Sequence, residues 1–184
     1  MTAAADATES RLLELLKLVN DWLKFAEAKN VGIVGLASGG MSVLVVALGR
    51  LEEAGLTPVS SLFIGAGVAC LAVSLLIGVS SFFPATAMPR WTRMRMEPPR
   101  ADDNLYFFGH AAKYDPTSLV IAVARRYDRT PDPVVCDVQA DLAAQLIVNA
   151  RITMQKLRLF RWSVAFFGGG VLLAGVGIVL IVAL

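Results

Sequence analysis

The chain has 184 residues, of which 56% are hydrophobic and 17% charged, and its formal net charge at pH 7 is +2. A soluble globular domain is nearer half apolar and a quarter charged, so one soluble core does not account for this composition. The apolar residues cluster in three uncharged runs, at 31–48, 62–83 and 163–184. Each run is about as long as the ~20 residues that a helix needs to cross a bilayer. The sequence therefore predicts an all-α membrane protein with three transmembrane helices.

The N-terminal segment, residues 1–30, has the pattern of an amphipathic helix, because its apolar residues recur every three or four positions. No proline interrupts the chain between residues 9 and 48, so we expect this helix to continue directly into the first span, 31–48. A cleaved signal peptide is not expected here, because the apolar run lacks a short basic leader and a cleavage pattern. The apolar stripe consists of Leu12, Leu15, Leu16, Val19, Trp22, Leu23 and Ala26.

A short external hairpin is predicted at 49–61, followed by the second span at 62–83. Two pairs of small residues have the spacing that lets transmembrane helices approach closely, Gly35-x-x-x-Gly39 in the first span and Gly170-x-x-x-Ala174 in the third. They predict helix packing or oligomerisation. No charged residue lies inside any of the three runs, so the usual mark of a proton relay or coupled transporter is missing.

The long segment 84–161 begins with a connector rich in proline and arginine, and "NLYFF" at 104–108 is predicted to be a strand or a buried extended piece. Asp115-Pro116 has the form of an N-cap and first turn, so a helix is expected over 116–128. Basic side chains suit the C-terminal end of that helix, and the alternative is an anion site, most simply for a phosphate. The residues expected in its core are Leu119, Ile121, Val123 and Ala124, and the basic residues are Arg125, Arg126 and Arg129.

A second long helix is predicted to start at Asp132-Pro133 and to run without a break into the third span, 162–184. Packed beside the N-terminal helix, it would bury both apolar stripes as a coiled-coil-like stalk. Three polar residues on its stripe either set the register or face a wet cavity, and register is favoured. The stripe contains Val135, Val138, Leu142, Leu146, Asn149, Ile152, Thr153, Lys156 and Leu159, of which Asn149, Thr153 and Lys156 are polar.

Lysine and arginine are distributed very unevenly between the two sides of the membrane. Residues 1–30 carry four, the hairpin 49–61 carries one, and 84–161 carries twelve. The positive-inside rule then places the N-terminus and 84–161 in the cytoplasm and the hairpin 49–61 outside. No motif that reads nucleic acid accompanies the charges, so we expect contact with lipid headgroups and not with nucleic acid. The charges at the membrane edges are Arg90, Arg93, Arg95, Lys156, Arg158 and Arg161.

The sequence gives no sign of catalysis, and we expect a protein that is not an enzyme and has no cofactor. His110 is the single histidine and has no cysteine or acidic neighbours at metal-ligand spacing, so no metal site is predicted. Most of the glycines lie in the spans instead of forming a phosphate-binding loop. Cys70 and Cys136 are expected to be unpaired thiols in a reducing compartment.

From about residue 12 to residue 175, the chain resembles the membrane-spanning effector family of Pycsar antiphage systems. The resemblance rests on the unit Phe25-Ala26-Glu27-x-Lys29 before the first span, on an aromatic "YFFG", and on Lys156 before the last span. The longer matching stretches are "FAEAKNVGIVG" at 25–35, Pro84 at the end of the second span, "NLYFFGHAAKYDPTSLVIAV" at 104–123 and "LAAQLIVNARITMQKLRLFRWS" at 142–163.

The resemblance implies an antiphage effector, functionally paired with a pyrimidine cyclase. Such an effector senses cyclic CMP or cyclic UMP in the cytoplasm and disrupts the inner membrane, which causes abortive infection, and we expect it to be a homo-oligomer. The alternative is a non-enzymatic membrane scaffold or small channel subunit whose cytoplasmic domain binds a protein partner. For a nucleotide ligand, we expect the phosphate near Lys113, Arg125 or Arg126 and the base against Tyr106, Phe107 or Phe108.

Overall fold

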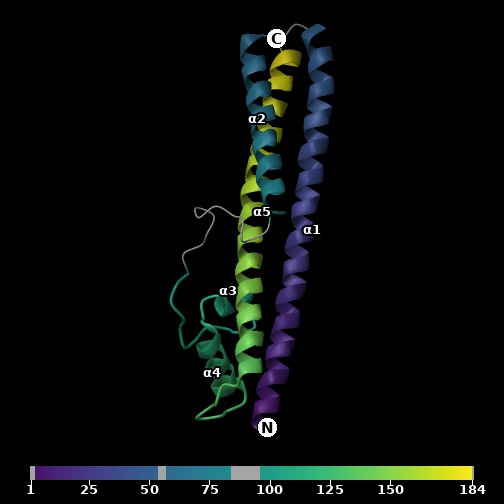
Figure 1. The fold of residues 1–184 in the computed structure, drawn as a ribbon. Coiled ribbons are helices and arrows are strands. Elements are labelled where there is room, and N and C mark those ends of the chain that lie inside the picture. Colours follow the sequence, from purple (N-terminus) through teal and green to yellow (C-terminus); the bar gives the residue numbers. More distant parts are fainter. Residues whose placement is uncertain (1–2, 54–56, 84–95, 184) are drawn as a thin grey trace. The chain divides into compact units, whose positions relative to one another are not determined.

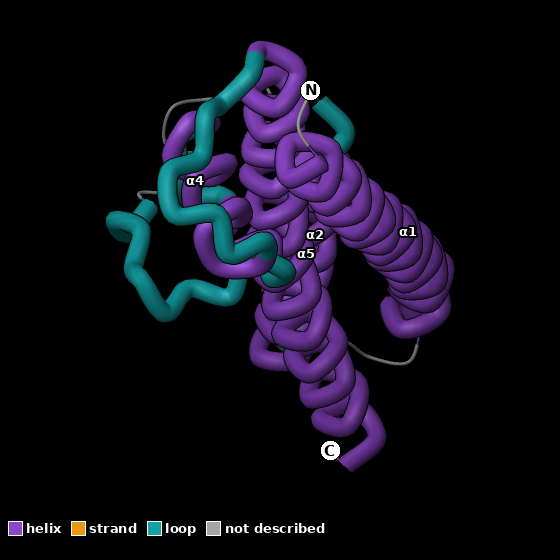
Figure 2. The backbone as a smooth tube through the Cα atoms, turned by 90° about the horizontal axis from the view of Figure 1, so that it is seen from below, coloured by secondary structure: helices purple, strands orange, loops and turns teal. Residues whose placement is uncertain are grey.

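The computed structural model describes residues 3–53, 57–83 and 96–183, and every regular element in these ranges is a helix (Figures 1 and 2). Three of the helices are long and apolar enough to cross a membrane, which confirms the predicted fold class. The first and last are unbroken, so the predicted continuity of each outer span with a more polar helix is confirmed as well. The helices are α1 (Ala3–Glu53), α2 (Pro58–Ser80), α3 (Phe108–Ala111), α4 (Pro116–Tyr127) and α5 (Asp137–Ala183).

The chain divides into two compact units. The first, here called the polar unit, comprises Met1–Ala26 and Met88–Lys156. The second, the apolar unit, comprises Glu27–Ala87 and Leu157–Leu184. Helices α1 and α5 each contribute residues to both units, so two continuous helices connect the units covalently.

In the apolar unit, α2 and α5 approach each other closely enough that their backbones touch at small residues (Figure 1). A Cβ atom on Gly67 would lie 2.8 Å from the carbonyl oxygen of Gly170 and 2.9 Å from the backbone nitrogen of Ala174. Further along α5, a Cβ on Gly177 would lie 3.0 Å from the carbonyl oxygen of Ser60. Gly170 and Ala174, the small-residue pair of the third span, thus lie against α2 within the chain.

A reciprocal pair of hydrogen bonds joins the same two helices. The Ser74 hydroxyl donates to the carbonyl oxygen of Ser163 at 2.8 Å, and the Ser163 hydroxyl donates to the carbonyl oxygen of Ser74 at 2.7 Å. Both side chains are fully buried. In a lipid environment such polar contacts between helices contribute about 0.6 to 2 kcal/mol, so the pair fixes the register of α2 on α5.

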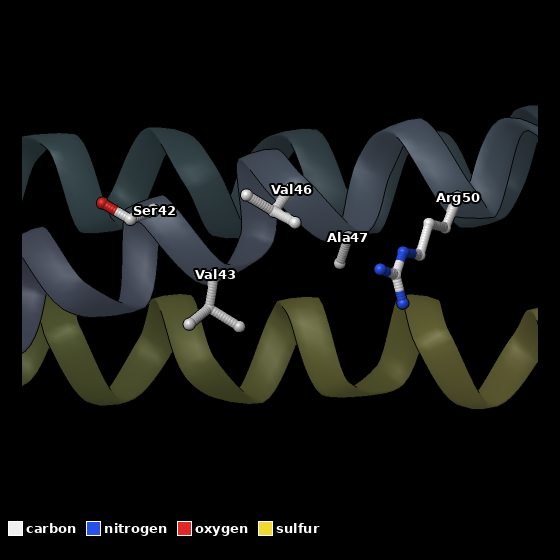
Figure 3. A pocket seen from close by; sticks show the side chains of 5 residues that line it. All are labelled: Ser42, Val43, Val46, Ala47 and Arg50. Carbon is white, nitrogen blue, oxygen red and sulfur yellow. The ribbon is translucent and has the colours of Figure 1, made fainter.

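Helix α1 contacts the rest of the apolar unit mainly between Ile33 and Gly40, where a Cβ on Gly40 would lie 3.6 Å from the Leu71 side chain. Ile33 and Ala37 are buried, and the Val34 side chain lies 2.7 Å from where a Cβ on Gly78 would stand. Of residues 38–50, none is buried, and Figure 3 shows five of their side chains along a groove on α1. Gly35 and Gly39 do not take part in the packing, since a Cβ at either would meet no atom of the described chain within 4 Å. Their expected role in oligomerisation remains a prediction.

The polar unit has a core built from α1, α4 and α5. The apolar stripe of α1 is buried along most of its length, and Asn149 of α5 donates a 2.8 Å hydrogen bond to the side-chain oxygen of Asn20 in α1. This bond supports the interpretation that Asn149 sets the register between the two helices. The buried apolar residues are Leu12, Leu15, Leu16 and Val19 of α1, Leu119, Val120, Val123 and Ala124 of α4, and Ala143, Leu146, Ile147 and Ala150 of α5.

The predicted start of the last helix at Asp132-Pro133 is wrong, because α5 begins at Asp137. The side-chain oxygen of Gln139 accepts a 3.4 Å hydrogen bond from the backbone N–H of Cys136, which satisfies a donor at the helix start. The preceding residues, Val134 and Val135, are β-branched and favour helix less. With the later start, the buried face begins at Gln139 and Ala143, whereas Val138, which we expected on the stripe, is 54% exposed.

The expectation of an extended segment at 104–108 is also wrong. Asn104 closes a turn, because its side-chain oxygen accepts from the backbone N–H of Tyr106 at 3.0 Å and its carbonyl from that of Phe107 at 3.0 Å. Helix α3 follows at once. A side chain at Gly109 would lie 2.5 Å from the ring of Phe107, so the glycine is what allows this ring to fold back. In α4, Val120 is buried where Ile121 was expected.

Several expectations fall outside the described residues. They concern the first part of the connector, 84–95, with Pro84, Arg90, Arg93 and Arg95, and residues 54–56 of the hairpin.

We predict that Gly67→Ala destabilises the apolar unit by about 1–3 kcal/mol, the usual cost of forcing extra volume into a packed contact. The added methyl group meets backbone atoms of α5, which cannot rotate away as a side chain can. Gly65→Ala is the matched control on the same helix, because a Cβ there meets nothing within 4 Å. Thermal melting in detergent checks this, and equal melting temperatures for both variants would contradict the close α2–α5 contact.

Candidate functional site

Two of the residues expected to bind a ligand, Lys113 and Arg126, contact a loop, 100–104, that is held by a buried carboxylate. The Asp103 side chain is 3% exposed. One of its oxygens accepts a 2.8 Å hydrogen bond from the ammonium group of Lys113, and the other accepts a 2.9 Å bond from the backbone N–H of Arg100. Lys113, which we expected near a phosphate, is therefore already paired with an acidic group inside the protein.

Helix α4 delivers a second basic residue to the same loop. Its start is fixed by Asp115, whose carboxylate accepts a 3.0 Å hydrogen bond from the backbone N–H of Ser118, as predicted for an N-cap. Hydrogen bonding from the Ser118 side chain, together with this bond from its backbone N–H, lowers the pKa of Asp115. Near the other end of α4, one guanidinium nitrogen of Arg126 donates to the carbonyl oxygens of Ala101 and Asp103. Lys113 and Arg126 are thus brought together around Asp103.

Burial and hydrogen bonding act in opposite directions on the pKa of Asp103. Burial raises this pKa, but the hydrogen bonds from Lys113 and from the Arg100 N–H outweigh burial, so the pKa of Asp103 is lowered. Burial also raises the pKa of the Tyr114 phenol, whose hydroxyl donates a 3.0 Å hydrogen bond to the carbonyl oxygen of Arg100. At neutral pH the loop is therefore held by an ionised Asp103 and a neutral Tyr114.

An exposed aromatic ring adjoins this cluster. Phe107 is 45% exposed, and its ring stands edge-on to that of His110 with 5.2 Å between ring centres. The Nδ1 atom of His110 accepts a 2.9 Å bond from the backbone N–H of Asn104 and lies 3.7 Å from a carboxylate oxygen of Asp103. Successive contacts thus link Phe107, His110, Asp103 and Arg126. We call this group the Phe107–Arg126 surface.

Tyr106 belongs to a different network, which ties α1 to the end of α4. Its hydroxyl accepts a 3.2 Å hydrogen bond from Arg11, and its ring packs against that of Tyr127. Arg11 also pairs with Asp128 at 3.1 Å, and the other carboxylate oxygen of Asp128 accepts a 2.7 Å bond from Thr8. Sequence reasoning missed this network, because its partners are more than 90 residues apart and carry no shared motif.

The other basic and aromatic residues considered for ligand binding lie in different environments from one another. Phe108 is 6% exposed and packs 5.4 Å from the ring of Trp22, so it belongs to the core. Arg125 is exposed, and among the described residues it has no hydrogen-bond or ion-pair partner. Arg129 has a left-handed φ of 54° just after α4, so it terminates this helix instead of extending the row of arginines along it.

A groove of about 350 Å³ lies along α1 in the polar unit, lined by Leu18, Asp21, Trp22 and Phe25. Trp22 was expected on the buried stripe, but it is 37% exposed, and its ring meets that of Phe25 edge-on at 5.6 Å. The rings of Trp22 and Phe25 lie on neighbouring turns of α1 and border this shallow, mainly apolar groove. Within the described residues, no group of three or more histidine, cysteine or acidic side chains is placed to hold a metal ion.

We predict that Asp103 makes the polar unit sensitive to acid. Its pKa is lower in the folded chain than the ordinary value of 3.8, so its contribution to stability is complete above about pH 4. That contribution is lost as the pH falls below 3.8 and through the lowered pKa. Asp103→Asn should make the free energy of unfolding less dependent on pH in this range. At neutral pH the substitution should lower it by about 3 kcal/mol, because Lys113 is left buried without its partner.

Thermal melting of the two proteins between pH 6 and pH 3 measures both effects. Asp21→Asn is the matched control, since Asp21 and Lys24 form an exposed ion pair that contributes little. An unchanged melting temperature for Asp103→Asn would show that the Asp103–Lys113 pair does not hold the loop.

Comparison with known proteins gives one family match. The model of the Pycsar effector protein domain, PycTM, matches residues 11–183. No curated protein and no solved structure matches the chain. The matched region includes α2, α3 and α4 and nearly all of α1 and α5, so it covers both compact units. The chain therefore belongs to the Pycsar effector family, and its role is that of an effector in antiphage defence.

Proposed function

We propose that this effector senses a cyclic pyrimidine mononucleotide, cyclic CMP or cyclic UMP, and responds by disrupting the inner membrane, which causes abortive infection. The observation that carries the proposal is the family match over residues 11–183 of a chain that has three candidate membrane spans. A pyrimidine cyclase would supply the ligand. The effector itself would act by binding, without catalysis and without a cofactor.

The Phe107–Arg126 surface is the part of the polar unit that best suits such a ligand. A guanidinium group has five N–H donors, and the bonds of Arg126 to Ala101 and Asp103 use only one of its nitrogens. The remaining donors can hold the cyclic phosphate, since guanidinium groups favour phosphate oxygens. The exposed ring of Phe107 offers a stacking surface for the base. The ion pair of Lys113 with Asp103 would fix the loop between these two groups.

Helices α1 and α5 are the route by which binding in the polar unit would act on the spans. Each helix is continuous across both units. A ligand can shift a conformational balance only through a difference in its affinity for the two states. We propose that the ligand favours one arrangement of these two helices, and that an assembly of several chains in that arrangement damages the bilayer. The excess of lysine and arginine in 1–30 and 84–161 supports a cytoplasmic location for the sensing part.

We predict that one pyrimidine cyclic nucleotide raises the melting temperature of the detergent-purified chain, because a ligand that binds the folded state alone stabilises it by mass action. The panel contains cyclic CMP, cyclic UMP, cyclic AMP and cyclic GMP. At 100 times the Kd, the stabilisation is about 2.7 kcal/mol. A well-folded protein that responds to none of the four would contradict direct sensing.

Two variants locate the site. Phe107→Ala and Arg126→Lys should each weaken binding by tenfold or more, because they remove a stacking ring and a forked donor. Phe25→Ala is the matched control, since Phe25 is also 45% exposed but lines the separate groove on α1. Loss of binding in Phe25→Ala with normal binding in Phe107→Ala would move the site to that groove and contradict the proposed surface.

A further inference from the structure

His110 belongs to the Phe107–Arg126 surface, and its hydrogen bond to the backbone determines which of its ring nitrogens carries the hydrogen. The backbone N–H of Asn104 donates to Nδ1 of His110 at 2.9 Å. A backbone N–H group can only donate, so Nδ1 accepts through its lone pair and carries no hydrogen. In a neutral imidazole the hydrogen is then on Nε2. The ring of His110 is therefore held with an N–H donor at Nε2.

The neighbouring carboxylate does not require a second hydrogen on this ring. A carboxylate oxygen of Asp103 lies 3.7 Å from Nδ1 of His110, but the same oxygen accepts a 2.8 Å hydrogen bond from the ammonium group of Lys113. The negative charge of Asp103 is thus already balanced by Lys113. The shorter contact of Nδ1 is the one with the Asn104 N–H, which favours the neutral ring.

The Nε2–H group of His110 is available to a ligand. The side chain is 36% exposed, and within the part of the chain that the structure describes Nε2 has no hydrogen-bond partner. Of the other side chains of the surface, that of Asp103 is 3% exposed and that of Phe107 has no polar atom. His110 and Arg126 are therefore the two side chains of the surface that can donate a hydrogen bond to a ligand.

The contacts of these two donors assign them to different parts of a ligand. The ring of His110 meets that of Phe107 at 90°, with 5.2 Å between ring centres. Arg126 is instead bonded to the backbone of Ala101 and Asp103. With the base on Phe107 and the phosphate at Arg126, the Nε2–H group lies on the base side of the ligand. An N–H donor needs an acceptor, and cytosine and uracil both have a carbonyl oxygen, O2, next to the nitrogen that bears the ribose.

We propose that His110 binds the base of the ligand, and that its Nε2–H donates to the O2 carbonyl oxygen of a pyrimidine ring stacked on Phe107. The inference rests on the proposed function, which places a cyclic pyrimidine nucleotide on this surface. The contact is the same for cytosine and uracil, because these bases differ at position 4 and share O2. Asn104 is a positioning residue, since its N–H keeps the hydrogen of the imidazole on Nε2.

Nuclear magnetic resonance of the detergent-purified full chain with isotope-labelled histidine tests the proposal. The chain has a single histidine, so each ring nitrogen gives one signal. We expect a hydrogen on Nε2 and none on Nδ1 in the free chain. Whichever of cyclic CMP and cyclic UMP raises the melting temperature should shift the Nε2–H signal and slow its exchange with water. A hydrogen on Nδ1 in the free chain would overturn the proposal.

Two comparisons separate this inference from the proposed function. Inorganic phosphate alone should leave the Nε2–H signal unchanged, and a shift with phosphate would assign His110 to the phosphate group and overturn the contact with the base. If a nucleotide raises the melting temperature but leaves the Nε2–H signal unchanged, the proposed function stands and the inference is wrong. If neither nucleotide binds the well-folded chain, the proposed function is wrong and the inference falls with it.

His110→Asn removes the donor and preserves the bond to the loop. The asparagine amide oxygen can accept from the Asn104 N–H in place of Nδ1, but the shorter side chain does not reach the position of Nε2. We expect the pyrimidine nucleotide to bind about fivefold more weakly, which corresponds to the roughly 1 kcal/mol net contribution of one hydrogen bond. The melting temperature of the free variant should equal that of the unsubstituted chain.

Unchanged nucleotide affinity in His110→Asn would show that the Nε2–H donor does not bind the base. If the free variant melts at a lower temperature, the labelled-histidine experiment decides, because it uses the unsubstituted chain.

Discussion

Within the hydrocarbon part of a bilayer no water is present to bind backbone N–H and C=O groups, and the rest of this structure depends on that constraint. It makes each apolar run a helix, and it removes the hydrophobic driving force that would hold helices together in water. Contact between the spans must then come from close packing and a few polar bonds. The α2–α5 pair has both, with Gly67 against Gly170 and the reciprocal bonds of Ser74 and Ser163.

The polar unit is stabilised differently, because the burial of apolar side chains away from water contributes to its stability. A charged group is costly to bury in such a core. Its buried acidic groups are each matched by a basic partner, Asp103 by Lys113 and Asp128 by Arg11. These pairs position a loop and a helix end. Their consequence for function is that part of the positive charge along 100–130 is used inside the protein. Arg125, Arg129 and the Arg126 donors that are not used in these bonds stay exposed, and they are the groups that the proposed anionic ligand would meet.

Helix α1 combines both kinds of environment in one element. Its first half is buried against α4 and α5 by leucines, its middle is held at Ile33 and Ala37, and none of residues 38–50 is buried. The last part therefore has few contacts to lose. Under the proposed function, a change of partners among the spans would involve this least restrained segment first.

The sequence by itself determined the three spans, the continuity of α1 and α5, the Asp115 cap and the family, because hydropathy, helical spacing and motifs depend on neighbours along the chain. Only the tertiary structure decided that Lys113 pairs with Asp103, that Arg11 meets Asp128 and that Ser74 meets Ser163, the last two pairs being more than 80 residues apart. It also decided that Gly170 packs against α2 while Gly39 faces open space, although both lie in the same kind of motif. The physical reason is that a small-residue motif makes a close approach between two helices possible, whereas the packing of the folded chain determines which helix makes that approach.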